Sequence, residues 1–235
     1  GSAVFVGMDL ARTMSELRLF GPAGPYGKEL RDVLEAFCFY RPDVGYVQGM
    51  SFQAAVMLIH CGDAGSAFVC LANVLSRPLF VAMYRNDPTL LALRLELFDL
   101  VFRANCPALA RHLEALETQA RTCVLAWLRS FFAKPLPLAL TALVWDRYFV
   151  EGELFIYRAA VGIFKVLSGR LLEMDQERAL GLLLGRLGAH LPDGPAVIEV
   201  MNMVKVPDKA QVLFDQVSKL RCDGPVYEQP PLLLS

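Results

Sequence analysis

The sequence has few histidines and no paired cysteine motif. Three histidines occur among 235 residues, and they share no metal-ligand spacing with one another or with the cysteines. None of the six cysteines forms a CxxC pair, and most of them fall within apolar helical patterns. This usage argues against a zinc site and favours free thiols in an intracellular protein over a disulfide framework. The cysteines are Cys38, Cys61, Cys70, Cys106, Cys123 and Cys222.

An excess of charge of one sign is also missing. The formal net charge is −1, and no run rich in lysine and arginine appears. The sequence therefore argues against nucleic acid or an acidic membrane surface as the main partner. Its longest apolar runs, such as residues 136–145, fall short of the roughly 18 residues that a membrane-spanning helix needs. We expect a cytoplasmic protein without a transmembrane segment.

The familiar enzyme signatures are absent as well. The chain has no GxxxxGK[ST] phosphate loop, no HExxH zinc motif and no GxSxG nucleophile motif. The glycine-rich segment 21–27 contains prolines, which lack the N–H donors that a phosphate cradle needs, so we expect a turn there. The acidic residues Glu151 and Glu153 fit a solvated loop better than an acid/base pair. An active site of the chain's own is not indicated.

Apolar residues at helical spacing are abundant. Hydrophobic residues make up 55% of the chain, above the roughly 45–50% of an average domain, so a large core is available. No run alternates with the period of two that marks a strand. We expect an all-α domain of about ten helices in two lobes, at about residues 3–118 and 119–220, followed by an irregular tail over 221–235. The clearest helical face comprises Leu30, Val33, Leu34 and Phe37.

Proline and glycine indicate where the helices end. One helix should run to about Tyr40 and end at Arg41-Pro42, because the residue before a proline is pushed out of the helical region. The next helix should start near Gln48 and continue to Cys61. The segment between them is therefore predicted to be a loop.

Two polar features stand out from the apolar helices, and the first is the pair Asp9 and Arg12. These residues are three apart, so one helical turn would bring their side chains together. Such a pair is usually a surface ion pair worth well under about 1 kcal/mol. The alternative is that Asp9 orients the Arg12 guanidinium toward an anion outside the protein.

The second feature is Gln48, in the segment RPDVGYVQGMSF over residues 41–52. In one interpretation the side chain is a satisfied buried amide or a partly exposed one on a mostly apolar helix. In the other, the preceding loop delivers Gln48 to the start of a helix, where its side chain projects outward. An outward amide can accept a hydrogen bond from a water and donate one to an anion at the same time.

Three segments together resemble the motifs of one family. Residues 6–13, VGMDLART, are similar to the IxxDxxR motif of TBC domains, which are GTPase-activating domains for Rab GTPases. Residues 46–50, YVQGM, resemble the YxQGM motif of that family. A Leu-Pro pair at 136–137, followed by VWD at 144–146, resembles its third motif. The three occur in the family's order, and the resemblance extends to about Leu220.

The resemblance implies a two-lobed helical TBC domain that activates a Rab-type small GTPase in trans. In this family the motif arginine and the motif glutamine both enter the active site of the GTPase. Carried over, Arg12 neutralises charge that develops on the transferred phosphoryl group, and Gln48 holds the attacking water. Asp9 then pairs with Arg12, while Tyr46 and Gly49 shape the turn at Gln48.

The resemblance also suggests supporting roles and a partner. Arg41 contacts either the partner or an acid of this chain. Trp145 and Asp146 are expected to be structural: a buried tryptophan whose N–H is satisfied, and a carboxylate that caps or braces nearby backbone. The implied partner is a Rab GTPase in its GTP-bound state. Because that partner carries GTP and Mg²⁺, no cofactor or metal of the chain's own is implied.

The chain departs from the family pattern in three respects. Val6 stands where isoleucine is typical, and Ser51 stands where asparagine is frequent. Family members usually have several helices before the first motif, so the most N-terminal helices are expected to be missing here. Peripheral recruitment to endomembranes in vesicle trafficking is expected to use regions outside this chain. The alternative function is a non-catalytic GTPase-binding or scaffold module, which the presence of both Arg12 and Gln48 disfavours.

Overall fold

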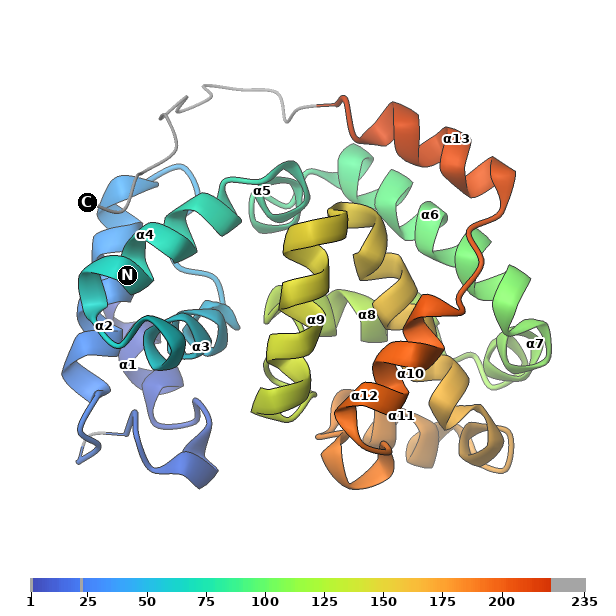
Figure 1. Ribbon diagram of the computed structural model, residues 1–235, viewed down its shortest axis with the longest axis horizontal. Helices are drawn as coiled ribbons and strands as arrows, with labels where there is room; N and C mark the ends of the chain where they lie inside the picture. The colour runs from blue at the N-terminus through green and yellow to red at the C-terminus, as the bar shows by residue number, and fades with distance from the viewer. Residues whose placement is uncertain (1, 22, 221–235) are drawn as a thin grey trace. The chain divides into compact units, whose positions relative to one another are not determined.

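The computed structural model describes residues 2–21 and 23–220, and this part of the chain is helical without a strand (Figure 1). It contains thirteen α-helices and two short 3-10 helices, at Ser15–Leu17 and Gly188–His190. The all-α prediction is confirmed, although the helices are more numerous than the ten expected. The tail predicted over 221–235 lies outside the described residues.

The described residues form two compact units. The first consists of the residues up to Asp87 together with Arg129–Lys134, and the second consists of Pro88–Leu128 together with Pro135–Leu220. The predicted boundary near residue 118 therefore differs from the observed division after Asp87. That prediction followed chain order alone, whereas the chain in fact returns to the first unit for residues 129–134.

The first unit is built around one helix that is buried over most of its length. Helix α3 packs against α1, α2 and α4, and every residue from Met50 to Leu58 is buried. A helix that is apolar on all sides must be covered on all sides, and this composition explains its central place. The helices of this unit are α1 (Ser2–Leu10), α2 (Gly27–Tyr40), α3 (Met50–Cys61), α4 (Ala64–Leu75) and α5 (Pro78–Tyr84).

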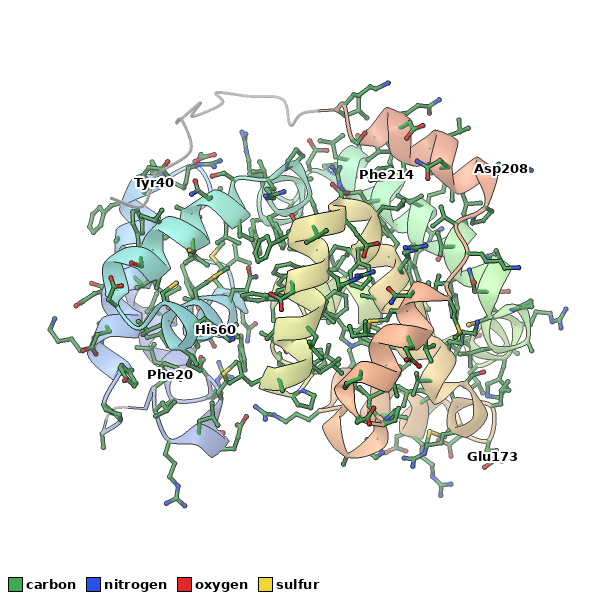
Figure 2. The ribbon with its side chains drawn as sticks, viewed as in Figure 1. Phe20, Tyr40, His60, Glu173, Asp208 and Phe214 are labelled. Carbon is green, nitrogen blue, oxygen red and sulfur yellow. The ribbon has the colours of Figure 1, made fainter. Side chains whose placement is uncertain are left out.

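The second unit is likewise organised by a buried helix, α10, which packs against α6, α9 and α12. Aromatic rings fill its interior, and the Phe164 ring of α10 lies 4.8 Å from that of Phe102 and 5.1 Å from that of Trp127 between centroids. Figure 2 shows side chains filling the interior of this unit. Its helices are α6 (Pro88–Asn105), α7 (Pro107–Ala115), α8 (Ala120–Arg129), α9 (Leu138–Glu151), α10 (Glu153–Leu171), α11 (Gln176–Leu184), α12 (Gly194–Asn202) and α13 (Asp208–Val217).

Of the two helix ends predicted around residues 40–50, the end of the first helix agrees with the structure and the start of the second differs. Helix α2 ends at Tyr40, directly before Arg41-Pro42, as predicted. Helix α3 begins at Met50, so Gln48 lies in the turn before the helix and not in its first turn. The intervening residue Gly49 has φ 105°. This left-handed backbone conformation separates the turn from the helix.

Within residues 2–21 and 23–220, no single helix is long and apolar enough to cross a membrane. Helices α4 and α5 meet the length and composition criterion only when taken together, and they are bent by 84° at their junction.

A buried ion pair joins α6 to α10 in the second unit. The Nε of Arg94 donates to Oε1 of Glu153 at 2.9 Å, and the Arg94 side chain is only 2% exposed. The Tyr157 hydroxyl donates to the same carboxylate oxygen at 2.9 Å. Burial and the neighbouring Glu153 charge raise the pKa of Tyr157 well above its usual value, so the hydroxyl keeps the proton that it donates.

Replacing Glu153 by alanine should destabilise the second unit strongly. The substitution leaves the Arg94 guanidinium buried without its counter-charge, which costs about 3 kcal/mol or more. Denaturant unfolding followed by circular dichroism measures the loss. The matched control is Arg178→Ala, which removes an exposed pair with Asp175 (N···O 3.7 Å) in the same unit. That change should stay under about 0.5 kcal/mol, and equal losses for the two variants would contradict the assignment.

Candidate functional site

Asp9 is the shared acceptor at the centre of the predicted site. It lies in the last turn of α1 and is buried. Its Oδ1 accepts a hydrogen bond from Nη2 of Arg12 at 2.7 Å, and its Oδ2 accepts one from the Tyr46 hydroxyl at 2.6 Å. Both carboxylate oxygens are therefore engaged, one by each of the two segments that the sequence singled out.

Arg12 is anchored at one nitrogen and open elsewhere. It lies in the turn that follows α1, and its side chain is 61% exposed, whereas that of Asp9 is 9% exposed. An ion pair with one exposed partner adds little to stability. The contact with Asp9 instead restricts the direction in which the guanidinium points. That this direction serves an anion outside the protein stays a prediction.

Tyr46 acts as a neutral donor to Asp9. Burial is the main cause that raises the pKa of Tyr46 far above its usual value, and the hydrogen bond to Asp9 adds to the rise. The phenol therefore stays protonated at any physiological pH. Tyr46 holds the carboxylate oxygen of Asp9 that Arg12 does not engage.

A second contact links the same two segments through hydroxyl groups. The buried Thr13 hydroxyl donates to the backbone carbonyl of Asp9 at 2.7 Å and lies 2.8 Å from Oγ of Ser51. A hydroxyl carries one proton, so Ser51 must donate in the second bond. Ser51, which stands where the family often has asparagine, thus joins the first turn of α3 to the turn after α1.

Gln48 is exposed, while Gly49 directly after it is buried. A Cβ placed on Gly49 would lie 2.7 Å from the backbone oxygen of Arg129, and its φ of 105° is one that side chains disfavour. Glycine is required here because the turn passes against the backbone of residue 129. The exposure of Gln48 agrees with the interpretation in which its side chain projects outward.

The amide that is buried in this region is Gln53. Its Nε2 donates to the carbonyl of Arg129 at 2.9 Å and contacts the Tyr84 hydroxyl, which itself donates to the same carbonyl at 3.0 Å. The Gln53 side chain is fully buried, and its Oε1 has no protein partner. No local pattern in the sequence marks Gln53, Tyr84 or Arg129, because their contact depends on the return of residues 129–134 to the first unit.

Arg41 turns out to pair with an acid of its own chain. Its Nε and Nη2 donate to the two carboxylate oxygens of Asp43, each at 2.8 Å, and its Nη1 donates to Ser76 Oγ at 3.1 Å. Both side chains of the pair are under a tenth exposed. The Arg41 guanidinium lowers the pKa of Asp43, so the pair stays charged and braces the loop that leads to Gln48.

Trp145 and Asp146 belong to α9 in the second unit and differ in their surroundings. Trp145 is buried, as predicted. Asp146 is exposed in the interior of α9, where the backbone groups are already used by the helix, so the predicted capping role is wrong. The helical spacing that buries Trp145 turns its neighbour Asp146 to the surface.

Two contacts thus join the segment 9–13 to the segment 46–51. The first contact joins Asp9, three residues before Arg12, to Tyr46, two residues before Gln48. The second joins Thr13, one residue after Arg12, to Ser51, three residues after Gln48. The two exposed side chains therefore lie on segments that are held together on both sides of them. Their approach to each other in an open groove stays a prediction.

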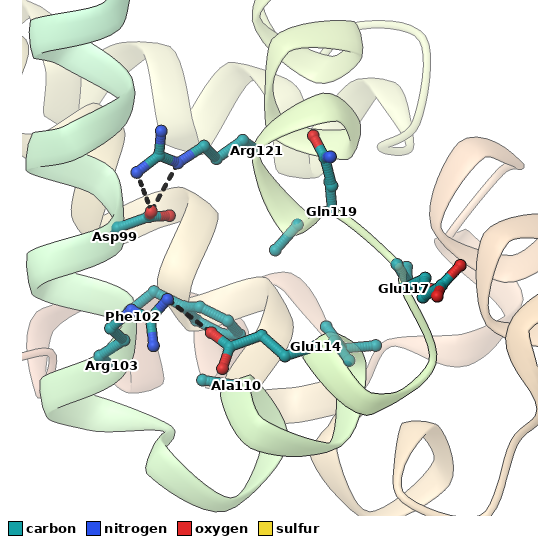
Figure 3. A pocket seen from close by; sticks show the side chains of 11 residues that line it. Asp99, Phe102, Arg103, Ala110, Glu114, Glu117, Gln119 and Arg121 are labelled. Carbon is teal, nitrogen blue, oxygen red and sulfur yellow. Dashed lines mark hydrogen bonds and ion pairs between the residues drawn. The ribbon is translucent and has the colours of Figure 1, made fainter.

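A cavity of about 690 Å³ lies in the second unit between α6, α7 and the start of α8 (Figure 3). Its floor is apolar, with Phe102, Ala110 and Leu113. Two ion pairs, Asp99 with Arg121 and Arg103 with Glu114, cross its walls. None of the residues that the sequence singled out lines this cavity.

Comparison with known proteins shows one family. The Rab-GTPase-TBC domain matches residues 3–172. TBC1 domain family member 14 of Mus musculus is 37% identical over 228 residues, which cover 97% of this chain and 32% of that protein. TBC1 domain family member 12 of Xenopus tropicalis is 37% identical over 174 residues, covering 74% of this chain and 25% of that protein. The chain thus spans a quarter to a third of these relatives.

Two solved structures share the fold. The Ypt/Rab-GAP domain of Gyp1p superposes with a TM-score of 0.71 at 15% identity and covers 92% of this chain and 73% of that one. The Chlamydomonas flagellar RabGAP TBC domain gives a TM-score of 0.63 at 22% identity, covering 92% of this chain and 66% of that one.

Replacing Gly49 by alanine should displace the turn that carries Gln48. The new Cβ would meet the Arg129 carbonyl oxygen at 2.7 Å on a left-handed backbone. Strain and contact together should cost roughly 3 kcal/mol or more in unfolding free energy. Gly45→Ala is the matched control, because Gly45 also has a positive φ (64°) but open space around it. Its cost should stay near about 1 kcal/mol, and a Gly49→Ala loss no larger than this would refute the close approach.

The Thr13–Ser51 bridge should appear as coupling between two substitutions. Thr13→Val keeps the shape of the side chain but removes the Thr13 hydroxyl that Ser51 bonds, at a cost of about 1–3 kcal/mol. Ser51→Ala removes the same bond but leaves the Thr13 hydroxyl paired with the Asp9 carbonyl, so its cost should be smaller. In denaturant unfolding the double variant should lose at least about 0.5 kcal/mol less than the sum of the single losses. Strictly additive losses would show that the two hydroxyls do not interact.

Proposed function

The chain belongs to the Rab-GTPase-TBC domain family, and on this premise we propose that it accelerates GTP hydrolysis by a Rab-type small GTPase. In this proposal Arg12 and Gln48 enter the active site of the partner. The chain acts in trans, as an activator without a reaction of its own. GTP and Mg²⁺ are supplied by the partner in its GTP-bound state.

The observation that carries the proposal is the anchoring of Arg12. Asp9 holds Nη2 at 2.7 Å while the side chain remains 61% exposed. A guanidinium has five N–H donors in a fixed plane, so the remaining donors are available to an external anion. A preset direction reduces the ordering cost on binding, which favours a role toward a phosphoryl group.

Gln48 supplies the complementary chemistry. Its neutral amide is exposed at the end of a turn whose position is fixed by Gly49 and by the Arg41–Asp43 pair. An amide can accept from a water and donate to a phosphate oxygen at once. In phosphoryl transfer the protein contributes positioning and charge stabilisation, and these are the roles assigned to Gln48 and Arg12 respectively.

Recruitment is proposed to depend on other parts of the protein. The chain spans a quarter to a third of the relatives described above. Peripheral attachment to endomembranes in vesicle trafficking, on the cytoplasmic side, is therefore assigned to regions outside this chain. The GTPase contact itself is assigned to the first unit, which carries both side chains.

Single-turnover hydrolysis with a panel of GTP-loaded Rab proteins tests the proposal. At least one Rab should hydrolyse GTP faster when the chain is added. Arg12→Ala should lower the acceleration by about 10³-fold, on the scale of arginine fingers in other GTPase systems, and Gln48→Ala by about 10²-fold, on the scale of losing one positioned hydrogen-bonding group. Arg31→Ala is the control, since it removes an exposed arginine of α2 in the same unit, and its rate should stay within about twofold.

The same measurements distinguish GTPase activation from the alternative function. Binding to a GTP-loaded Rab without acceleration would replace the proposal by a non-catalytic binding module. Equal rates for the wild type, Arg12→Ala and Gln48→Ala would show that neither side chain enters the active site. Circular dichroism of each variant confirms that the fold is retained.

A further inference from the structure

Two cysteines of the first unit lie side by side at the end of α3. Cys61 is the last residue of α3 and Cys70 lies within α4, and their Sγ atoms are 3.8 Å apart. Both side chains are partly exposed, and both thiols are free. Neither residue contributes to the contacts of Asp9, Arg12 or Gln48 described above.

The turn between the two helices holds the sulfurs in this arrangement. Gly62 ends α3 with a φ of 80°, and its N–H donates to the carbonyl of Leu58 at 2.9 Å. Asp63 then begins α4 by accepting the N–H of Ser66 at 2.8 Å. With a left-handed glycine and a side-chain cap at successive residues, the connection has little freedom. The backbone of this turn therefore brings the two sulfurs close together, and their proximity does not depend on the side-chain rotamers alone.

We propose that Cys61 and Cys70 form a dithiol site that glutathione disulfide oxidises to an intramolecular disulfide. A disulfide bond measures about 2.05 Å, so the sulfurs must approach by less than about 2 Å, a movement that rotation about χ1 supplies. The site lies at the end of α3 remote from Gln48. Helix α3 has 12 residues, and at about 1.5 Å per residue its ends are about 18 Å apart.

The reaction balances in two exchange steps. One cysteine, as a thiolate, attacks a sulfur of glutathione disulfide, whose S–S bond breaks, and the first glutathione leaves as a thiolate. The other cysteine thiolate attacks the protein sulfur of the mixed disulfide and expels the second glutathione. The protein loses two protons and two electrons, and glutathione disulfide is reduced to two glutathione molecules.

The surroundings of Cys61 make the first step slow at neutral pH. Burial, the Cys70 thiol and the Asp63 carboxylate raise the pKa of Cys61 to about 11. Because only the thiolate attacks, oxidation through Cys61 should accelerate by about tenfold per pH unit as the pH rises toward this value.

The wild-type chain incubated with glutathione disulfide at pH 8 tests the site. Alkylation of the remaining thiols, followed by peptide mapping and mass spectrometry, should show a cross-link between the peptides of Cys61 and Cys70. The intact mass should fall by two hydrogen atoms. Cys61→Ser should abolish the cross-link and leave a stable glutathione adduct on Cys70. Cys38→Ser, which removes another partly exposed thiol of the first unit, should leave the cross-link unchanged.

Two further measurements do not depend on variants that alter the fold. Phenylarsine oxide bridges neighbouring thiols, so it should protect Cys61 and Cys70 together from alkylation in the wild-type chain. Closure should also raise the melting temperature by about 3–8 °C, since a cross-link restricts the unfolded chain. Stable glutathione adducts on both cysteines without closure, cross-links to other cysteines, or a lowered melting temperature would each overturn the proposal.

Discussion

The close approach of Gly49 to the carbonyl oxygen of Arg129 constrains the first unit at the turn that carries Gln48. Helix α3 is buried from its first residue, Met50, to Leu58, so the chain that enters it must pass directly from the surface into the core. Gly49 makes this passage with a φ of 105° and no side chain in the way. The residue before it, Gln48, is consequently left at the surface.

The same carbonyl also accepts hydrogen bonds from buried donors of α3 and α5. Gln53 and Tyr84 both donate to the oxygen of Arg129, so a single backbone group serves two buried donors. Unsatisfied donors in a core cost more than a hydrogen bond contributes. Residues 129–134 therefore complete the first unit even though the chain on either side of them belongs to the second.

Asp9 shows how a weak ion pair can be informative about function. Its pair with Arg12 contributes little stability because Arg12 is largely exposed. The carboxylate is nevertheless buried and held by Tyr46, whose raised pKa keeps it a donor. Tyr46 fixes the buried carboxylate, and the carboxylate in turn holds Arg12, so the contact restricts the direction of the guanidinium. The Arg41–Asp43 pair, by contrast, is buried on both sides and braces the loop.

The sequence alone determined the helical class, the end of α2 at Tyr40 and the identity of the family, because periodicity, proline and short motifs are local signals. It left two interpretations each for Asp9, Arg41 and Gln48, since a residue's partners are set by segments distant in the chain. Only the tertiary structure decided that Arg41 pairs with Asp43, that Gln53 is the buried amide and Gln48 the exposed one, and that Asp146 faces outward. It also moved the division of the chain from residue 118 to Asp87, because the packing of α6 on α10 and the return of residues 129–134 leave no local trace in the sequence.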